Sequence, residues 1–248
     1  MRNSAIVLGA LTAILDTASA HGFVTGIQAG STWTKGADPV WFYSPSNSRP
    51  QTAGWDSLNQ DLGFVEPNNL GTSDINCHKS ATAGRLYATV AAGQTIQIPW
   101  NTWPSDSHKG PIINYIAPCN GDCTTLTPGA LRWSKISAAG LSNGKWPTDP
   151  LPTNNFTSSL TIPSKLKAGN YVLRHEIIAL HGAQNDNGAQ LYPQCINLQV
   201  TGGGSVSPTN GVAGAALYKK DDAGIKYNLY TGQTTYPIPG PALWTAAN

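Results

Sequence analysis

The hydrophobic positions of this chain come in short runs that are separated by stretches rich in glycine, proline and asparagine. Runs of this length bounded by turn residues predict β-strands, and the spacing of an amphipathic helix is scarce. Strands without intervening helices predict an all-β fold, a β-sandwich rather than a βαβ arrangement. The predicted strands are residues 23–27, 85–90, 95–99, 111–117, 158–162, 171–180 and 195–201.

Two long connections, residues 31–72 and 201–248, are predicted to be elaborate loops on this sandwich. Long loops on a rigid scaffold are where proteins commonly carry their function. The segment 201–211 (TGGGSVSPTNG) has the composition of an interdomain linker, but residues 212–248 contain no cysteine and little core-forming sequence. We therefore interpret 212–248 as a tail packed back on a single domain.

The first twenty residues have the pattern of a secretory signal peptide. Arg2 supplies a positive charge, residues 5–15 form an apolar run, and Ala18-Ser19-Ala20 has the small-residue pattern of a cleavage site. The apolar run is shorter than the roughly 20 residues that cross a bilayer, so we expect no membrane association. Cleavage after Ala20 predicts a secreted, extracellular protein, residues 21–248, whose first residue is His21.

Composition argues against nucleic acid as the partner. The formal net charge is only +2, and charged residues make up 11% of the chain. A nucleic-acid-binding domain would show a basic patch or stripe. The abundance of Gly (26), Pro (18) and Trp (8) instead fits many turns and exposed aromatic side chains.

The four cysteines predict two disulfides, because their number is even and the expected compartment is oxidising. Three pairings are possible. Cys119 and Cys123 flank the short segment NGD, which favours a tight loop closed between them and leaves Cys77 to pair with Cys195. A zinc site is disfavoured because the CxxC spacing is missing. The only N-glycosylation sequon begins at Asn155, in a predicted polar turn.

Hydrolytic chemistry has little support in the sequence. A glycosidase needs a pair of carboxylates, and beyond the leader the chain has ten aspartates, mostly in turn contexts, and two glutamates. The Gly-x-Ser-x-Gly motif of many serine hydrolases is absent.

Histidine offers a more specific hypothesis. If His21 is the first residue, its α-amine, with a pKa near 7.7–8.0, and its ring nitrogen can chelate one metal ion. His108 lies in a loop directly before a predicted strand, where its position would be fixed. A third nitrogen from His108 would complete the planar arrangement that Cu(II) prefers.

Further residues are expected near such a site. His175 is interpreted as structural, whereas His181, at the exit of its strand, can supply a hydrogen-bond donor behind the metal ligands. Gln190 and Tyr192 are two residues apart, and Pro193 favours an extended Tyr192, so both side chains point the same way. Tyr192 would be an axial ligand and Gln190 a donor to a bound co-substrate. The alternative is that Tyr192 is a core tyrosine near Cys195.

These motifs together resemble one known family. An N-terminal HG, then HKGP, RHEIIALH, AQLYPQC and a late YPIPGP resemble the fungal lytic polysaccharide monooxygenases of auxiliary-activity family nine, over essentially the whole mature chain. The resemblance implies an immunoglobulin-like β-sandwich whose flat face bears one copper ion. It implies copper ligation by His21 and His108, an axial Tyr192, His181 and Gln190 nearby, and disulfides Cys77–Cys195 and Cys119–Cys123.

The resemblance also implies an oxidative enzyme. Its substrate would be cellulose or a related β-1,4-glucan, hydroxylated at carbon one or four of the glycosidic link, with an external electron donor and oxygen or hydrogen peroxide. Sugar rings would stack on Tyr236, which matches the family's surface tyrosine, and less strongly on Tyr43. We expect a monomer without an appended cellulose-binding module. The competing hypotheses are a non-catalytic copper protein and a metal-free carbohydrate-binding module.

Overall fold

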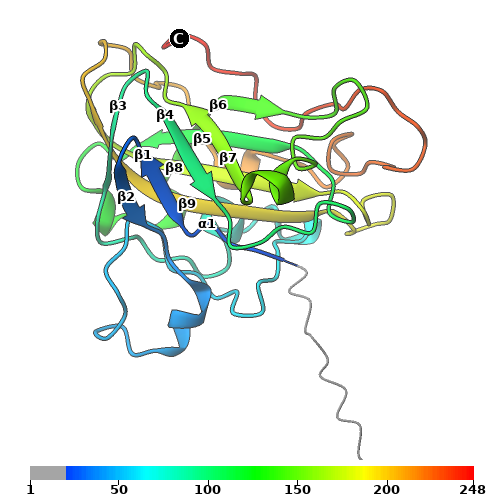
Figure 1. Ribbon diagram of the computed structural model, residues 1–248, viewed down its shortest axis with the longest axis horizontal. Coiled ribbons are helices and arrows are strands. Elements are labelled where there is room, and N and C mark those ends of the chain that lie inside the picture. Colours follow the sequence, from blue (N-terminus) through cyan, green and yellow to red (C-terminus); the bar gives the residue numbers. More distant parts are fainter. Residues whose placement is uncertain (1–20) are drawn as a thin grey trace, which may run out of the picture.

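Two β-sheets form the framework of the chain over residues 21–248, the part that the computed structural model describes (Figure 1). The predicted signal peptide lies outside the described residues. The smaller sheet has the order β2 (Thr32–Lys35), β1 (Gly26–Ala29), β4 (Thr95–Pro99), β7 (Thr157–Thr161). The larger sheet has the order β10 (Val212–Ala213), β6 (Arg132–Ala139), β5 (Ile112–Pro118), β8 (Gly169–Ala179), β9 (Gln190–Thr201), β3 (Ala88–Ala91).

Helices are few and short. The one α-helix among the described residues is α1 (Asp74–Cys77), and no helix there is long and apolar enough to cross a membrane. Single 3-10 turns occupy the connections: η1 (Pro39–Tyr43), η2 (Pro67–Asn69), η3 (Cys123–Thr125), η4 (Pro128–Ala130), η5 (Leu151–Asn154) and η6 (Gly214–Ala216). The predicted all-β sandwich is thus confirmed.

The larger sheet is buried on both faces, which explains its nearly continuous apolar strands. On β5, Ile112 and Ile116 face one hydrophobic cluster, together with Ile96 and Ile98 of the smaller sheet. Ile113 belongs to a second cluster on the opposite face. The side chains alternate because successive residues of a strand point to opposite faces. The sandwich core therefore lies on one side of β5, β8 and β9, and loops cover the other side.

The C-terminal segment supplies much of that second layer. Leu217, Tyr218 and Ile225 are buried in it. The Tyr218 hydroxyl donates to Glu176, 2.5 Å away, and Glu176 forms a fully buried ion pair with Arg174. The residues after the linker-like stretch therefore pack against the larger sheet.

Strand boundaries differ from the sequence prediction in several places. The predicted strand 23–27 begins only at Gly26, and Val24 forms an isolated bridge to Trp100 instead of extending the strand. β9 begins at Gln190, five residues before the predicted start. β2 lies inside a predicted loop, and β6 was not predicted.

The β6 sequence RWSKISAA has no clear apolar pattern, because some of its buried positions are polar residues. The C-terminal tail covers these side chains. Ser134 and Lys135 are buried, and the Lys135 ammonium donates to the Pro239 carbonyl at 2.7 Å. A polar residue buried through a partner distant in sequence leaves no local signature.

Both predicted disulfides are present. Cys77–Cys195 joins the end of α1 to β9 across 118 residues of sequence. Cys119–Cys123 closes the short turn after β5.

Candidate metal centre

Two glycines allow the backbone near His21 and His108 to approach neighbouring backbone segments closely. A Cβ atom on Gly22 would lie 2.1 Å from the Thr102 carbonyl oxygen, and one on Gly110 would lie 1.8 Å from the Ile178 carbonyl oxygen. Real Cβ atoms do not come so close, so a side chain at either position would displace the backbone. The HG and HKGP motifs therefore combine a candidate ligand with the glycine that permits its placement.

Further hydrogen bonds fix both segments. The Phe23 amide donates to Asn101 Oδ1 at 2.8 Å, one residue after Gly22. The carbonyl of His108 accepts from Trp103 Nε1 at 3.1 Å, and the His108 amide donates to the Pro104 carbonyl at 2.9 Å. The loop before β5 is thereby held from both sides of the His108 side chain.

The structure brings three of the predicted side chains into one cluster. The ring centroid of His21 lies 5.2 Å from that of His108 and 5.5 Å from that of Tyr192. His181 adjoins them, with its ring centroid 4.2 Å from that of His108. These residues come from the beginning of the described chain, the loop before β5, the exit of β8 and the start of β9.

Two ring nitrogens in this cluster are buried without a hydrogen-bond partner among the described residues. They are Nε2 of His108 and Nδ1 of His181. Buried polar atoms in native proteins are nearly always paired, so an unpaired nitrogen indicates a missing water, ligand or ion. The other nitrogen of His108, Nδ1, lies 2.8 Å from the Ser107 hydroxyl. The Ser107 hydroxyl donates to the Pro104 carbonyl at 3.2 Å, so its oxygen is left to accept from Nδ1–H, and in that tautomer Nε2 carries the lone pair.

Tyr192 and Gln190 point toward the same place, as their spacing predicts. The Tyr192 hydroxyl donates to Gln190 Oε1 at 2.7 Å, which leaves the Gln190 amide nitrogen as the donor of that side chain. Tyr192 is fully buried in the sandwich core, with its ring 5.1 Å from that of Trp103. The two interpretations of Tyr192 are therefore compatible: its ring belongs to the core and packs against His21.

The electrostatic environment keeps the imidazoles neutral. Burial first, then the neighbouring His181 and His21, lower the pKa of His108 to about 4. Burial and His181 likewise lower the pKa of His21, although the Asp61 carboxylate opposes this. Burial and the negative charge of Asp61 raise the pKa of the Tyr192 phenol. Neutral imidazoles have the free lone pairs that metal binding requires.

The side chains of this cluster are donors of the kind that suits copper, and they do not form a cage of carboxylates and thiolates. Within residues 21–248, no group of three or more His, Cys, Asp or Glu side chains is arranged to hold a metal ion. A site here would instead consist of the imidazoles of His21 and His108, the amine of an N-terminal His21 and the Tyr192 phenol. Nitrogen-rich planar sites with a weak axial oxygen suit Cu(II).

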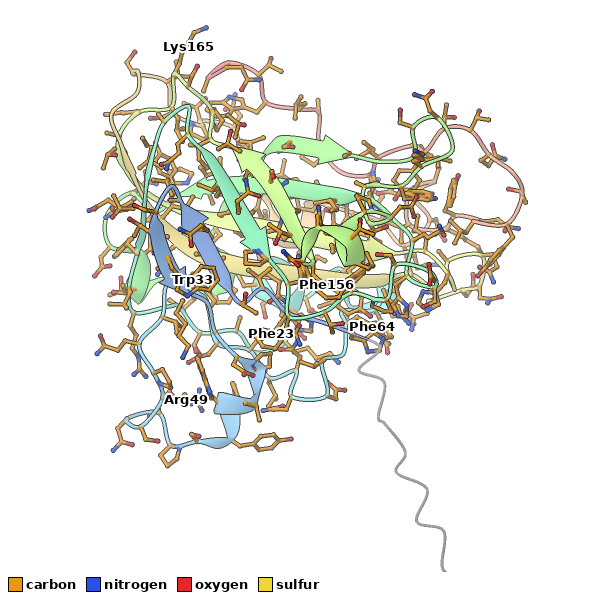
Figure 2. All side chains as sticks on the ribbon, in the orientation of Figure 1. Phe23, Trp33, Arg49, Phe64, Phe156 and Lys165 are labelled. Carbon is orange, nitrogen blue, oxygen red and sulfur yellow. A yellow bond between two sulfur atoms is a disulfide. The ribbon has the colours of Figure 1, made fainter. Side chains whose placement is uncertain are left out.

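Sequence reasoning missed Phe64 and Asp61, which lie in one loop beside the cluster. The ring centroid of Phe64 is 5.9 Å from those of both His21 and Tyr192. Figure 2 labels Phe64 close to the beginning of the described chain. The loop lies inside the long predicted connection and has no motif of its own, so no sequence signal could have found it.

The prediction for Tyr236 is wrong. Its ring is only 9% exposed and packs edge-to-face on Trp146 and Tyr227, each with centroids 5.1 Å away. Its hydroxyl donates to the Gly224 carbonyl. Tyr236 is therefore a core residue of the C-terminal segment, unavailable to stack on a ligand.

Other aromatic side chains are exposed instead. Tyr43, at the end of η1, is 77% exposed, and Tyr230 is 67% exposed. The Tyr230 hydroxyl donates to the His181 carbonyl at 3.1 Å, so this ring lies beside the cluster. Its position among turn residues, in NLYTGQ, is the sequence signal that could have identified it. The Tyr43 loop is fixed by Arg49, labelled in Figure 2, whose guanidinium donates to the carbonyls of Phe42 and Ser44.

Two predicted positions lie apart from the cluster. His175 is fully buried, with Nδ1 2.7 Å from Asn114 Oδ1 and Nε2 accepting from Trp100 Nε1 at 3.0 Å, as expected of a structural residue. Asn155 is exposed in a left-handed turn after η5, where a glycan could be attached without displacing the core.

Comparison with known proteins identifies close relatives. The profile of Auxiliary Activity family 9 (formerly GH61) matches residues 21–236. AA9 family lytic polysaccharide monooxygenase F of Malbranchea cinnamomea is 51% identical over 239 residues, which cover 95% of this chain and 96% of the relative. AA9 family lytic polysaccharide monooxygenase H of Thermothelomyces thermophilus is 53% identical over 248 residues, covering 98% and 71%.

Solved structures also match this chain. The extended catalytic domain of H. jecorina LPMO9A matches with a TM-score of 0.84 and 44% identity, covering 91% of this chain and 93% of that one. Cel61B from Hypocrea jecorina matches with a TM-score of 0.86 and 41% identity, covering 90% and 100%. The family match includes both candidate histidine ligands and Tyr192.

Proposed function

Because this chain belongs to auxiliary activity family 9, whose members are copper-dependent lytic polysaccharide monooxygenases, we propose that it cleaves the β-1,4-glucan chains of cellulose oxidatively, at carbon one or four of the glycosidic link. The family implies a polysaccharide substrate and a reductant. Cellulose, or a closely related β-glucan, is the substrate that we propose for this chain.

We propose that one copper ion would be held by the amine and ring nitrogen of His21, by Nε2 of His108 and by the Tyr192 phenol. The observation that carries this assignment is the buried, unpaired Nε2 of His108, whose ring lies 5.2 Å from that of His21. Reduced by an external electron donor, the bound copper would supply the chemistry that activates oxygen or hydrogen peroxide to hydroxylate the glycosidic carbon.

The neighbouring polar groups would orient the co-substrate. Gln190 accepts from Tyr192 through its carbonyl oxygen, so its amide N–H is left to donate into the site. His181 contributes a buried, unpaired Nδ1. Neither side chain needs to ligate the metal. Each would place a hydrogen-bonding atom, the Gln190 amide nitrogen or His181 Nδ1, beside the metal.

Substrate binding is proposed at the exposed aromatic rings. Sugar rings have apolar faces that pack on aromatic side chains, and Tyr43 and Tyr230 are the most exposed large aromatic residues in the part of the chain that the structure describes. Tyr230 lies next to His181, and Tyr43 projects from η1. Replacing either tyrosine by alanine is expected to weaken binding to crystalline cellulose while leaving copper binding unchanged.

The maturation of the chain follows from the same assignment. We propose that residues 1–20 are removed during secretion and that residues 21–248 act as one extracellular catalytic domain and as a monomer. Until Ala20 is removed, the nitrogen of His21 is an amide and a poor ligand. Cleavage makes it an amine, which gives up its proton readily to a metal.

The decisive experiment compares the protein that begins at His21 with a variant that carries one additional alanine before it. The extended variant is expected to fold normally, to lose tight copper binding and to release no oxidised cello-oligosaccharides with ascorbate and cellulose. Normal turnover by the extended variant would refute the site. Tight copper binding by the native protein without oxidised products from any β-glucan would instead indicate a non-catalytic copper protein.

A further inference from the structure

His78 is a buried histidine whose hydrogen bonds connect it to the loop beside the candidate metal centre. It is 1% exposed. Its Nε2 lies 2.9 Å from the Gly63 carbonyl and its Nδ1 accepts from the Lys79 amide at 2.9 Å. These partners fix one tautomer, in which Nε2–H donates to Gly63.

The backbone of His78 is held in an unfavourable conformation. Its φ of 81° and ψ of 178° fall in a region that glycine adopts and other residues rarely do. Such outliers persist where the surroundings over-determine them, and they cluster at functional sites. Both ring nitrogens of His78 are hydrogen-bonded to neighbouring backbone, so the ring is held in place together with this conformation.

Gly63 directly precedes Phe64, the residue of this loop whose ring contacts the candidate metal centre. Phe64 packs edge-on against both His21 and Tyr192, with ring centroids 5.9 Å from each. On its other side, Val65 exchanges two backbone hydrogen bonds with Leu191, at 2.8 and 3.1 Å. Phe64 is therefore held at both neighbours, by His78 through Gly63 and by β9 through Val65.

A disulfide completes this arrangement. Cys77, the residue before His78, is bonded to Cys195, three residues beyond Tyr192 on β9. The chain segments at Gly63, at His78 and at Tyr192 are thus joined in a closed ring of contacts, two of them hydrogen-bonded and one covalent. A displacement of the His78 ring would be transmitted to Phe64, because β9 fixes the remaining members of the ring.

We propose that His78 is a positioning residue for the metal centre: by holding the Gly63 carbonyl it presses Phe64 against His21 and Tyr192 and so fixes the orientation of the N-terminal imidazole. This inference rests on the proposed copper site but concerns residues that do not ligate the metal. Groups that orient metal ligands from outside commonly change metal affinity 10–100-fold when they are lost.

The test uses the protein that begins at His21 and two variants. In His78→Gly the ring is removed, while glycine accepts the unusual backbone conformation. In His78→Gln the side chain retains an N–H near the position of Nε2. His78→Gly is expected to bind Cu(II) about tenfold more weakly, to shift the Cu(II) electron paramagnetic resonance spectrum, and to change the His21 ring proton shifts of the copper-free protein. His78→Gln is expected to restore most of each property.

Asn197→Ala is the matched control. Asn197 is a fully buried polar residue of β9, and its side-chain hydrogen bonds go to Trp55, Gly84 and Leu86 rather than to the Phe64 loop. This variant is expected to lose thermal stability but to keep wild-type copper affinity and spectrum. If His78→Gly is less stable yet has the wild-type affinity, spectrum and His21 proton shifts, His78 is only structural and the inference is overturned.

A fourth variant covers the case in which His78→Gly does not fold. Phe64→Leu leaves the His78 hydrogen bonds intact and removes the aromatic contact, so it is expected to reproduce the spectral change and the weaker copper binding. Wild-type behaviour of Phe64→Leu would overturn the inference. Failure of the native protein itself to bind copper would instead contradict the proposed function, so the two failures are distinguishable.

Discussion

Four histidines of this protein have buried ring nitrogens, and they fall into two groups that differ in one respect. His78 and His175 have both ring nitrogens within hydrogen-bonding distance of protein groups. His108 and His181 each have a buried nitrogen without a partner among the described residues. Burial is the largest cause of the lowered pKa in all four, so a depressed pKa by itself does not distinguish a ligand from a structural residue.

The difference lies in how the hydrogen-bonding capacity of each ring is used. A histidine with both nitrogens paired stabilises the fold, and its removal leaves its partners unsatisfied. We propose that a histidine with an unpaired buried nitrogen serves binding, so its removal should leave the fold nearly intact. This contrast between paired and unpaired histidines can be tested by mutation.

The largest expected effect is the loss of copper from the unpaired group. We expect His108→Ala to weaken Cu(II) binding by more than about a hundredfold. Loss of a residue that only supports a ligand weakens metal binding up to about a hundredfold, and this variant removes a proposed ligand itself. The measurement is a competition titration against a chelator, with circular dichroism to show that the fold is retained. Undiminished one-to-one binding would disprove the role of His108.

His175, the paired histidine that lies apart from the metal centre, should show the opposite behaviour. His175→Leu leaves Trp100 Nε1 and Asn114 Oδ1 without their buried partner and is expected to lower the free energy of unfolding by about 2–4 kcal/mol. Urea denaturation of the copper-free protein measures this change. The variant should still bind one copper ion per chain, and loss of copper without loss of stability would contradict the distinction.

Acid should destabilise the protein through every histidine whose pKa is depressed in the fold, the paired group included. The pKa is about 3 for His175 and about 4 for His78 in the folded protein, against an ordinary value of 6.5. Their stabilisation is fully present above pH 6.5. It is lost as the pH falls toward 4, because the unfolded chain takes up protons that the folded chain does not.

Each of these histidines should contribute about 1.4 kcal/mol per pH unit to that loss. The free energy of unfolding of His175→Leu should therefore depend less steeply on pH between 6 and 4, by about that amount. Urea titrations at several pH values measure the difference. Parallel pH profiles for wild type and variant would show that His175 is not neutral in the folded state.

The smallest expected effect concerns the tautomer of His108. Ser107→Ala removes the hydroxyl that lies 2.8 Å from Nδ1 and is expected to weaken Cu(II) binding about tenfold or less. Ser105→Ala is the control, because the Ser105 hydroxyl bonds the Thr148 carbonyl and not the His108 ring. Equal copper affinities in both variants would show that the Ser107 contact does not select the ligating nitrogen.

The sequence predicted those parts of the molecule that have local patterns. A nearly continuous apolar run identified β5, and apolar residues on either side of Arg174–Glu176 identified β8, because both faces of the larger sheet are buried. The two-residue spacing of Gln190 and Tyr192 correctly predicted that their side chains point the same way, and the two are hydrogen-bonded. The histidine positions were predicted from the chemistry of an N-terminal amine together with the resemblance to a known family.

The failures share a physical cause, which is contact between segments distant in sequence. β6 was missed because its polar residues are buried by the tail, and Tyr236 was misplaced because Trp146 and Tyr227 enclose its ring. Phe64 reaches the site only because His78 and β9 hold its loop. No pattern within a short window of sequence contains these contacts.

For protein engineering, the loop that ends at Arg49 is an exchangeable cassette. Arg49 binds the carbonyls of Phe42 and Ser44, and Arg85 donates to the Ser46 carbonyl at 2.8 Å, so the loop that presents Tyr43 is held mainly through its backbone carbonyls. No proposed copper ligand belongs to it. A library randomised over residues 43–48, with Arg49 retained, can therefore be screened for new polysaccharide preferences without redesigning the redox centre.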